Sequence, residues 1–276
     1  MIPADRLDLY RRLADVALLE VPGGRALASI HPLRPRTGML AIDGGVAAIR
    51  AGEAWLRARG CTRVFGPMEV STWFPYRARL GPDEEPSFFG EPDAEPGAWL
   101  EAGYRDAARY ASTLVQNEVA IARGEEKRPA GVSVRPMGNA GEVLDLVYRI
   151  SHEAFARAFA FTPLPRAAFD VLHRPLVQRV DPRLVLIAER DGEALGFVLG
   201  IPHRPGRLIV KTLAVRPCAQ TAGVGTWLVG ELHRASASLG YTEGIHALMW
   251  SGSHSGRICP SGKLIREYAL FERELS

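Results

Sequence analysis

The sequence predicts an α/β fold, and three observations support this prediction. Along residues 132–276, apolar runs rich in β-branched residues alternate with segments whose apolar residues recur at helical spacing. The dipeptide Asp191–Gly192 separates two such apolar runs, which is typical of a β-hairpin. The run Leu208–Val215 is followed by a glycine-containing turn and then by a helical pattern. This alternation is typical of a domain that packs helices against a sheet.

The C-terminal part divides into elements with recognisable ends. Asn139 is a suitable N-cap for one helix, and the Pro163–Pro165 segment begins another. A third helix follows the turn and ends near Gly240. We therefore expect helices at 139–150, 163–176 and 225–239, and strands at Val132–Arg135, Leu184–Arg190, Ala194–Ile201, Leu208–Val215, Glu243–Trp250 and Ile265–Phe271.

The N-terminal part begins with apolar residues at helical spacing over Leu7–Leu18, which predicts an amphipathic helix. After it we expect a strand at Arg25–Ile30, a helix at Val46–Arg59, a strand at Arg63–Met68 and a Pro- and acid-rich loop at 81–97.

The polar segment Ala122–Gly131 contains Pro and Gly, so we interpret residues 122–131 as a linker. It separates an N-terminal domain, residues 1–121, from a C-terminal domain, residues 132–276. Both lengths are within the usual range for one domain.

Composition limits the class of protein. The chain has 276 residues, a net charge of +3 and three scattered cysteines, which predicts neither a disulfide framework nor a metal site. The basic residues form no stripe, so we expect no nucleic-acid partner. No apolar run approaches the roughly 20 residues of a membrane span, and the N-terminus has no signal-peptide pattern. We therefore expect a cytoplasmic protein with no membrane partner.

The turn after the Leu208 strand predicts an anion-binding loop. A strand that passes through such a turn into a helix directs several backbone N–H groups at one place, and glycine lets a ligand approach the backbone. An ordinary strand–helix turn with capping glycines is the alternative. The spacing Gln-x-x-Gly-x-Gly after a Leu-x-Val strand resembles the acyl-coenzyme A loop of the GNAT acetyltransferase superfamily. The matching residues are Leu213, Val215, Gln220, Gly223 and Gly225.

The resemblance extends over the order of elements in residues 132–276. It implies an α/β (α+β) fold with a mixed, mostly antiparallel central sheet flanked by helices. It also implies acetyl-CoA or another acyl-CoA as cofactor, bound through the backbone of the strand and loop. The cofactor-binding residues would be Leu213, Ala214, Val215, Gln220, Thr221, Ala222, Gly223, Val224, Gly225 and Thr226.

The N-terminal part repeats some of this order. Its helix, Gly60 and the Arg63 strand parallel the later helix, Gly240 and the Glu243 strand, which predicts an internal repeat. We interpret residues 1–121 as a degenerate, truncated GNAT-like half, as in tandem GNAT proteins. A shared α/β layout without common origin is the alternative. Residues 41–48 have glycines without the loop's spacing, so we assign them no cofactor.

The general base departs from the family pattern, because Lys211 occupies the position where many relatives have Glu. A neutral imidazole is a suitable replacement near pH 7, and His246, His203 and His152 are the candidates. We select His246 because it lies on the strand next to the Leu213 strand. A chain of water molecules to bulk solvent is the alternative.

The residues expected to supply the general acid also differ from the family pattern. The family often uses an Asn, a Ser and then a Tyr after the fifth strand, but Ser253 stands at the Asn position. Ser255 matches the Ser, and Tyr268 is the nearest tyrosine, so Ser255 and Tyr268 are the catalytic candidates beside His246. A core position for Tyr268 is the alternative reading.

Aromatic residues are the candidate walls of an acceptor pocket. They are Phe155, Phe159, Phe161 and Trp250, with Trp73, Tyr76, Phe88 and Phe89 from the N-terminal part.

The sequence thus predicts transfer of an acetyl or short acyl group from coenzyme A to a small-molecule or peptide amine. A non-catalytic acyl-CoA sensor and an acyltransferase acting on a hydroxyl are the alternatives. A homodimer is compatible with the sequence.

Overall fold

A computed structural model describes residues 4–275 of the chain. Its helices are α1 (Ala4–Leu13), α2 (Val46–Arg57), α3 (Gly97–Glu101), α4 (Asn117–Glu126), α5 (Ala140–Phe155), α6 (Arg166–Val177) and α7 (Val224–Ser238). Its strands are β1 (Asp15–Val21), β2 (Gly24–Ile30), β3 (Thr37–Asp43), β4 (Arg63–Gly66), β5 (Ala78–Gly81), β6 (Arg105–Gln116), β7 (Ser133–Pro136), β8 (Val185–Arg190), β9 (Glu193–Pro202), β10 (Arg207–Val215), β11 (Glu243–Trp250) and β12 (Lys263–Glu274).

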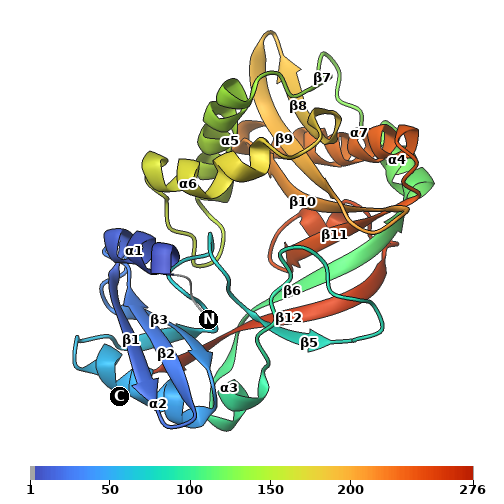
Figure 1. Cartoon of the computed structure of the whole chain (residues 1–276). Coiled ribbons are helices and arrows are strands. Elements are labelled where there is room, and N and C mark those ends of the chain that lie inside the picture. Colours follow the sequence, from blue (N-terminus) through green and yellow to red (C-terminus); the bar gives the residue numbers. More distant parts are fainter. Residues whose placement is uncertain (1–3, 276) are drawn as a thin grey trace.

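The strands form one sheet in the order β1-β2-β3-β4-β12-β6-β11-β10-β9-β8-β7, with β5 paired to β12. Within the described residues, β3–β4 and β10–β11 are parallel pairs and the other pairs are antiparallel. The two long strands β6 and β12 run diagonally between the lower and upper parts of the molecule in Figure 1. The predicted fold class, a mixed and mostly antiparallel sheet flanked by helices, is confirmed.

Each half of the sheet contains one strand–helix–strand unit with a parallel pair. In the N-terminal half the unit is β3–α2–β4, and in the C-terminal half it is β10–α7–β11. Strand β12 then pairs with β4, and β6 pairs with β11, so each half is completed by a strand from the other part of the chain. Both halves of the sheet thus contain the same type of unit, and the sheet continues across the predicted linker.

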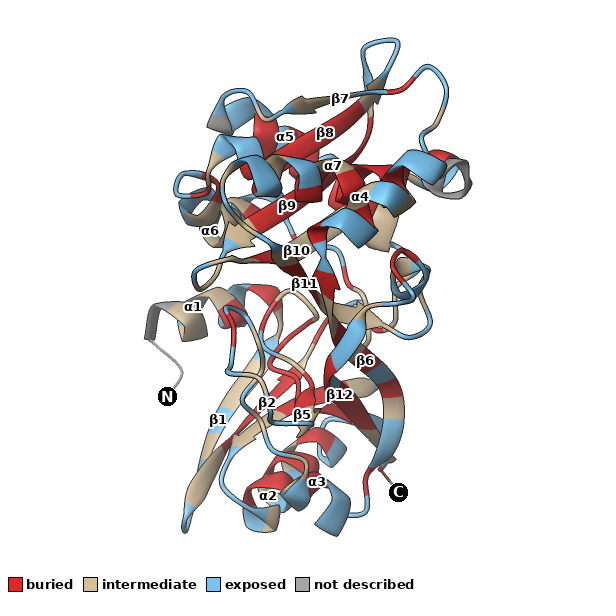
Figure 2. Cartoon of the chain, turned by 90° about the vertical axis from the view of Figure 1, so that its right-hand side faces the viewer, coloured by how far each residue is buried: buried red, intermediate tan, exposed pale blue. Residues whose placement is uncertain are grey.

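Helices cover both faces of the C-terminal half of the sheet. Alternate residues of β8 point to opposite sides: Ile187 packs in the cluster with α5 and α6, and Leu186 packs in the cluster with α7. Helix α4 lies against α7 on that second side. Figure 2 shows buried residues along β8 and β9 and where β6 and β12 cross the middle of the molecule. The sheet is therefore held rigidly from both sides around β10 and β11.

Most predicted elements of residues 132–276 are confirmed, including the Asp191–Gly192 hairpin between β8 and β9. The predicted N-terminal helix is wrong beyond Leu13, because Val16 and Leu18 lie on β1 and pair with β2. Strands β3 and β6 were not predicted, and residues 122–126 of the predicted linker form the end of α4. Among the described residues, no helix has the length and apolar character needed to cross a membrane.

Candidate functional site

Strands β10 and β11 separate partway along their length and open a gap in the sheet. They pair in parallel from Arg207 with Glu243 to Val210 with His246, and both strands continue beyond that pair. Each shifts register against its other neighbour just there, β10 after Val210 and β11 after His246. Leu248, inside the shifted segment of β11, has a left-handed backbone with φ of 58°. The gap is therefore formed by the backbone of two adjacent strands and not by a mobile loop.

A cavity of about 1250 Å³ occupies this gap. Its walls come from the ends of β10 and β11, the start of α7, helices α5 and α6, and a segment of the N-terminal part at residues 72–77. The predicted aromatic residues Phe155, Phe159, Phe161, Trp250, Trp73 and Tyr76 line it. Phe88 and Phe89 do not: Phe88 packs against Ile209, Ile245 and Ile265, and Phe89 is exposed.

The predicted cofactor loop lies at one end of this cavity. A 3-10 helix, Pro217–Ala222, leads into α7 through Gly223, whose φ is 79°. A Cβ at Gly223 would lie 2.5 Å from the carbonyl oxygen of Lys127, so both the backbone angle and the neighbouring chain require glycine. The side chains of Gln220, Thr221 and Ala222 lie outside the described part of the structure.

The first turn of α7 brings backbone N–H groups to the cavity wall. The first four N–H groups of an α-helix have no partner within the helix. No side chain caps α7, and its first turn contains no acidic residue. Gly223, Gly225 and Thr226 line the cavity together with Leu213, Ala214 and Val215, whereas Val224 is fully buried. The structure therefore brings most of the predicted loop and strand residues around one space, at an end that favours an anion.

The charges around the cavity are mostly positive. Among the described residues that line it, Glu126 is the one carboxylate, and it pairs with Arg123. The cationic residues among the lining are Arg77, Lys127, Arg128, Arg157, Lys211 and Arg257. This set of donors suits a ligand with several negative charges, such as the phosphates of a coenzyme A.

His246 is the one of the three candidate histidines that lines the cavity. It is the last β11 residue paired with β10, so it lies where the gap opens. His152 is engaged through both ring nitrogens, with the Tyr148 carbonyl and with the backbone of Leu164. His203 lies in the turn between β9 and β10, outside the lining residues.

A chain of hydrogen bonds fixes the protonation pattern of His246. Asn117 at the start of α4 donates through Nδ2 to the carbonyl of Tyr241 (2.7 Å), so its Oδ1 accepts from Nδ1 of His233 (2.8 Å). Nε2 of His233 then carries the lone pair and accepts from Nε2 of His246 (3.0 Å). The remaining nitrogen of His246, Nδ1, therefore carries a lone pair and has no protein partner among the described residues.

Burial keeps both imidazoles neutral. It lowers the pKa of His233 to about 4, and burial with the nearby His233 lowers the pKa of His246 to about 3. A neutral imidazole with so low a pKa can accept a hydrogen bond at neutral pH, but it is a weak base and does not hold a second proton. His246 is thus arranged as a fixed acceptor at the closed end of the gap.

The two acid candidates have different positions. Ser255 lines the cavity, and its hydroxyl is hydrogen-bonded to that of Ser253. Tyr268 is fully buried on β12, donates to Glu91 (2.6 Å) and lies outside the lining residues; burial raises its pKa. The structure therefore brings Ser255 and His246 to one cavity and leaves Tyr268 in the core.

Four residues at or behind the cavity were not predicted to be functional: Arg77, Lys211, Asn117 and His233. The sequence offered a signal for two of them, because Arg77 ends an aromatic-rich segment and Lys211 replaces the family's Glu. Asn117 and His233 are far from His246 in sequence and carry no local pattern.

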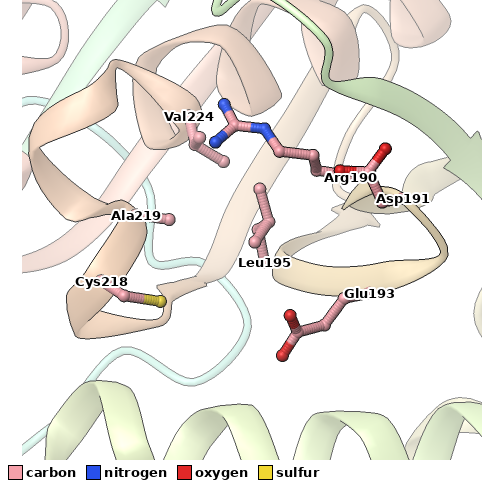
Figure 3. Close-up of a pocket in the computed structure, with 7 residues that line it drawn as sticks. All are labelled: Arg190, Asp191, Glu193, Leu195, Cys218, Ala219 and Val224. Atoms are coloured by element: carbon pink, nitrogen blue, oxygen red, sulfur yellow. The ribbon is translucent and has the colours of Figure 1, made fainter.

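A smaller pocket of about 290 Å³ lies beside the same loop (Figure 3). Cys218 and Ala219 line one side, and Arg190, Asp191 and Glu193 of the β8–β9 hairpin lie opposite. Glu193 already pairs with Arg216, and its charge and that of Asp191 offset Arg190. This pocket therefore lacks the positive field of the large cavity.

Comparison with known proteins finds a family match in the same part of the chain. Residues 144–252 match the model of the acetyltransferase (GNAT) family. The chain is 31% identical over 206 residues to a bacterial ceramide synthase of Caulobacter vibrioides, a match that covers 65% of this chain and 53% of that protein. The match thus spans about half the length of this relative.

Two solved structures resemble most of the chain. A GCN5-related N-acetyltransferase from Sphaerobacter thermophilus aligns with a TM-score of 0.57 at 17% identity, over 91% of this chain and 76% of that one. A tandem GNAT protein from the clavulanic acid biosynthesis pathway aligns with a TM-score of 0.52 at 12% identity, over 92% and 79%. Residues 144–252, which contain the strand, the loop and α7, are thus similar to the GNAT family, and the two solved structures share the fold of the chain.

Proposed function

We propose that this protein transfers an acyl group from an acyl-coenzyme A to an amine, with both substrates bound in the large cavity at once. The observation that carries the proposal is the junction of two features in one space. The uncapped start of α7 meets the gap between β10 and β11 there, so one ligand has both an anion-binding end and an open strand edge.

The residues present suit the cofactor. Backbone N–H groups of Gly223, Val224, Gly225 and Thr226 would hold the pyrophosphate at the start of α7. Gly225 has no Cβ, so a ligand can approach its backbone from the cavity. A Cβ at this position would contact Leu213 and Val215, at 3.5 Å each. The side chains of Lys127 and Arg128 add positive charge close by. The strand Leu213–Val215 would offer backbone groups to the rest of the cofactor.

In the reaction, the amine nitrogen bonds to the thioester carbonyl carbon, the carbon–sulfur bond breaks, and the thiolate leaves. We propose that Nδ1 of His246 accepts a hydrogen bond from a substrate N–H at the closed end of the gap and so orients it. The proton released by the amine would pass to water, because the low pKa of His246 makes it a poor proton store. Ser255, whose hydroxyl reaches the cavity wall, is the proposed donor toward the departing sulfur.

The acceptor is proposed to carry an apolar portion. The cavity wall includes Phe155, Phe159, Phe161, Trp73 and Trp250. A curated relative is named as a ceramide synthase, and a ceramide is an amide of a long-chain amine. Both observations favour an amine acceptor, or an acyl chain, with a substantial hydrocarbon part.

We also propose that residues 1–121 form a degenerate GNAT-like half and residues 132–276 the acyl-CoA-binding half. The two strand–helix–strand units support this division. Glycines also precede α2, but the large cavity lies at α7. The N-terminal half instead contributes residues 72–77 to the cavity wall.

A matched pair of substitutions tests the cofactor site. Gly225→Val adds a side chain at the cavity end of α7, and its Cβ would make only ordinary van der Waals contacts. Gly45→Val adds one before α2, where nothing lies within 4 Å of the new Cβ. We expect calorimetric titration to show coenzyme A binding in the natural protein and in Gly45→Val and strongly weakened binding in Gly225→Val. Equal affinities in all three proteins would refute the loop assignment.

Release of free coenzyme A separates the enzyme from a binding protein. Acetyl-CoA and longer acyl-CoAs are incubated with a panel of amines of increasing hydrocarbon length, and the free thiol is measured. Turnover with at least one amine is expected. Tight acyl-CoA binding without turnover across the panel would favour a non-catalytic acyl-CoA sensor.

A further inference from the structure

We propose that Arg77 and Lys211 form a second anion-binding subsite in the cavity, and that it binds a carboxylate or a phosphate of the acceptor. The assignment of this anion to the acceptor rests on the proposed function, whereas the anion subsite itself is inferred from the positions and charges of Arg77 and Lys211. It specifies the acceptor class: an amine that also carries a negative charge.

Arg77 is a buried guanidinium held in one place. Its backbone is left-handed, with φ of 74°, although it is not glycine, and its N–H donates to the carbonyl of Pro67 (2.7 Å). The guanidinium lies over the rings of Tyr76 and Tyr110, 3.8 and 4.2 Å from their centres. Nη1 donates to the carbonyl of Leu248 (3.2 Å), and the buried Nε has no partner. The side chain is therefore fixed at the cavity wall with unused donor capacity.

Lys211 brings a second cation to the same wall. It lies on β10 one residue after the last pair with β11, and it lines the cavity with Arg77. Its ammonium lies against the 81–97 loop, since a Cβ at Gly90 would be 2.6 Å from Nζ. Burial and the positive charge of Arg77 lower the pKa of Lys211 to about 8.

No acid neutralises this pair within the described residues. Neither Arg77 nor Lys211 forms an ion pair with a carboxylate, and no carboxylate contributes to the pKa of Lys211. His173 of α6 also faces Lys211, and its pKa is lowered by burial. Buried charges in proteins are ordinarily paired, because an unpaired charge in a low dielectric is costly. Two adjacent cations facing a cavity thus indicate that the counter-charge arrives with a ligand.

This subsite is separate from the start of α7. A Cβ at Gly225 would contact Leu213 and Val215, which follow Lys211 by two and four residues on β10. At roughly 3.3 Å per residue this corresponds to about 7–13 Å along the strand. We therefore assign an anion at Arg77 and Lys211 to a different part of the bound ligands than the anion at α7.

The chain has three lysines, Lys127, Lys211 and Lys263, which permits a direct measurement. Protein labelled with ¹⁵N at lysine Nζ is titrated with inorganic phosphate and, separately, with acetate, in saturating coenzyme A. The Lys211 signal is assigned by its loss in Lys211→Met. We expect a saturable shift of this signal and a rise in the pKa of Lys211 with the preferred anion. Lys263, which is exposed on β12, is the internal control.

The two anions distinguish a phosphate from a carboxylate as the natural group. Arg77→Gln should weaken the saturation of the Lys211 signal by about 10- to 100-fold, the usual contribution of a charge-assisted hydrogen bond. Lys211→Met keeps the volume and removes the charge, so it should raise the melting temperature of the free protein and abolish any increase caused by the anion. No saturation with either anion, or saturation unchanged by Arg77→Gln, would overturn the subsite.

A kinetic comparison tests the link to the acceptor. Straight-chain ω-amino acids are compared with alkylamines of equal length, and the charged member should have a kcat/KM about 10- to 100-fold higher. In Lys211→Met that preference should disappear, mainly through KM. Equal kcat/KM for both members would show that the anion does not belong to the acceptor. If no amine is acylated while phosphate or acetate still saturates Lys211, the proposed function fails and the subsite stands.

Discussion

The buried pair His233 and His246 should make the protein sensitive to mild acid. Burial lowers the pKa of His233 from 6.5 to about 4, and that of His246 from 6.5 to about 3. In the folded protein both rings stay neutral at pH 5, whereas in the unfolded chain both take up a proton. Proton uptake by the unfolded chain favours unfolding, so the free energy of unfolding falls as the pH drops below about 7 and continues to fall toward pH 4.

The size of the effect follows from these pKa values. Between pH 7.5 and pH 5, each histidine with an unfolded pKa of 6.5 removes roughly 2 kcal/mol of stability. The pair therefore accounts for about 4 kcal/mol, a large fraction of the stability of a typical domain. Other histidines with lowered pKa, such as His173, titrate equally in any variant that leaves them unchanged.

Urea unfolding at pH 7.5 and pH 5 measures this difference. The double variant His233→Gln and His246→Gln removes both titrating groups and should lose about 4 kcal/mol less between the two pH values than the natural protein. The absolute stability of the variant is not the readout, because the comparison is between its own two pH values. An unchanged pH dependence would show that the two imidazoles are not held neutral by burial, and would refute the hydrogen-bond chain from Asn117.

Three further predictions concern stability and are measured by urea unfolding at pH 7.5. Gly223→Ala should cost about 2–4 kcal/mol, from the left-handed backbone and from the close approach to Lys127; a cost below 0.5 would refute that requirement. Gly230→Ala, which usually favours a helix, should instead destabilise by about 1–2 kcal/mol, because its Cβ would lie 2.8 Å from the Cα of Gly124 where α4 crosses α7. Stabilisation would show that the helices separate freely. Arg266→Met should cost about 3–5 kcal/mol, since it leaves the buried Glu91 without its ion pair at 3.0 Å; adding Glu91→Leu should restore part of the loss, and no recovery would contradict the ion-pair explanation.

Local sequence pattern was sufficient to predict an element where the buried face of that element, or a single turn, decided its structure. The Asp191–Gly192 hairpin has a turn dipeptide that favours the left-handed backbone, and both residues have positive φ. The order of elements from β7 to β12 followed from apolar runs and breakers for the same reason. The first helix was predicted too long, because the apolar residues of β1 happen to continue the helical spacing of α1.

Contacts between residues far apart in the sequence could not be predicted from local pattern. Strand β6 contains four alanines or serines with weak strand preference, and it exists because β11 and β12 pair with its two edges. The Asn117–His233–His246 chain joins residues from the start of α4, the middle of α7 and β11. No spacing in the sequence marks such a chain, since its members meet only after three elements have packed.

The sequence by itself determined the glycine-containing loop before α7 and its resemblance to the acyl-coenzyme A loop of the GNAT family. Backbone angles and close approaches there depend on residue type at adjacent positions, and those are local properties. Tertiary structure alone decided what surrounds the loop. The separation of β10 from β11, the cationic pair Arg77 and Lys211, and the neutral state of His246 all arise from burial and packing between distant segments. For that reason the sequence predicted a coenzyme A site, and the structure was needed to propose what kind of acceptor meets it.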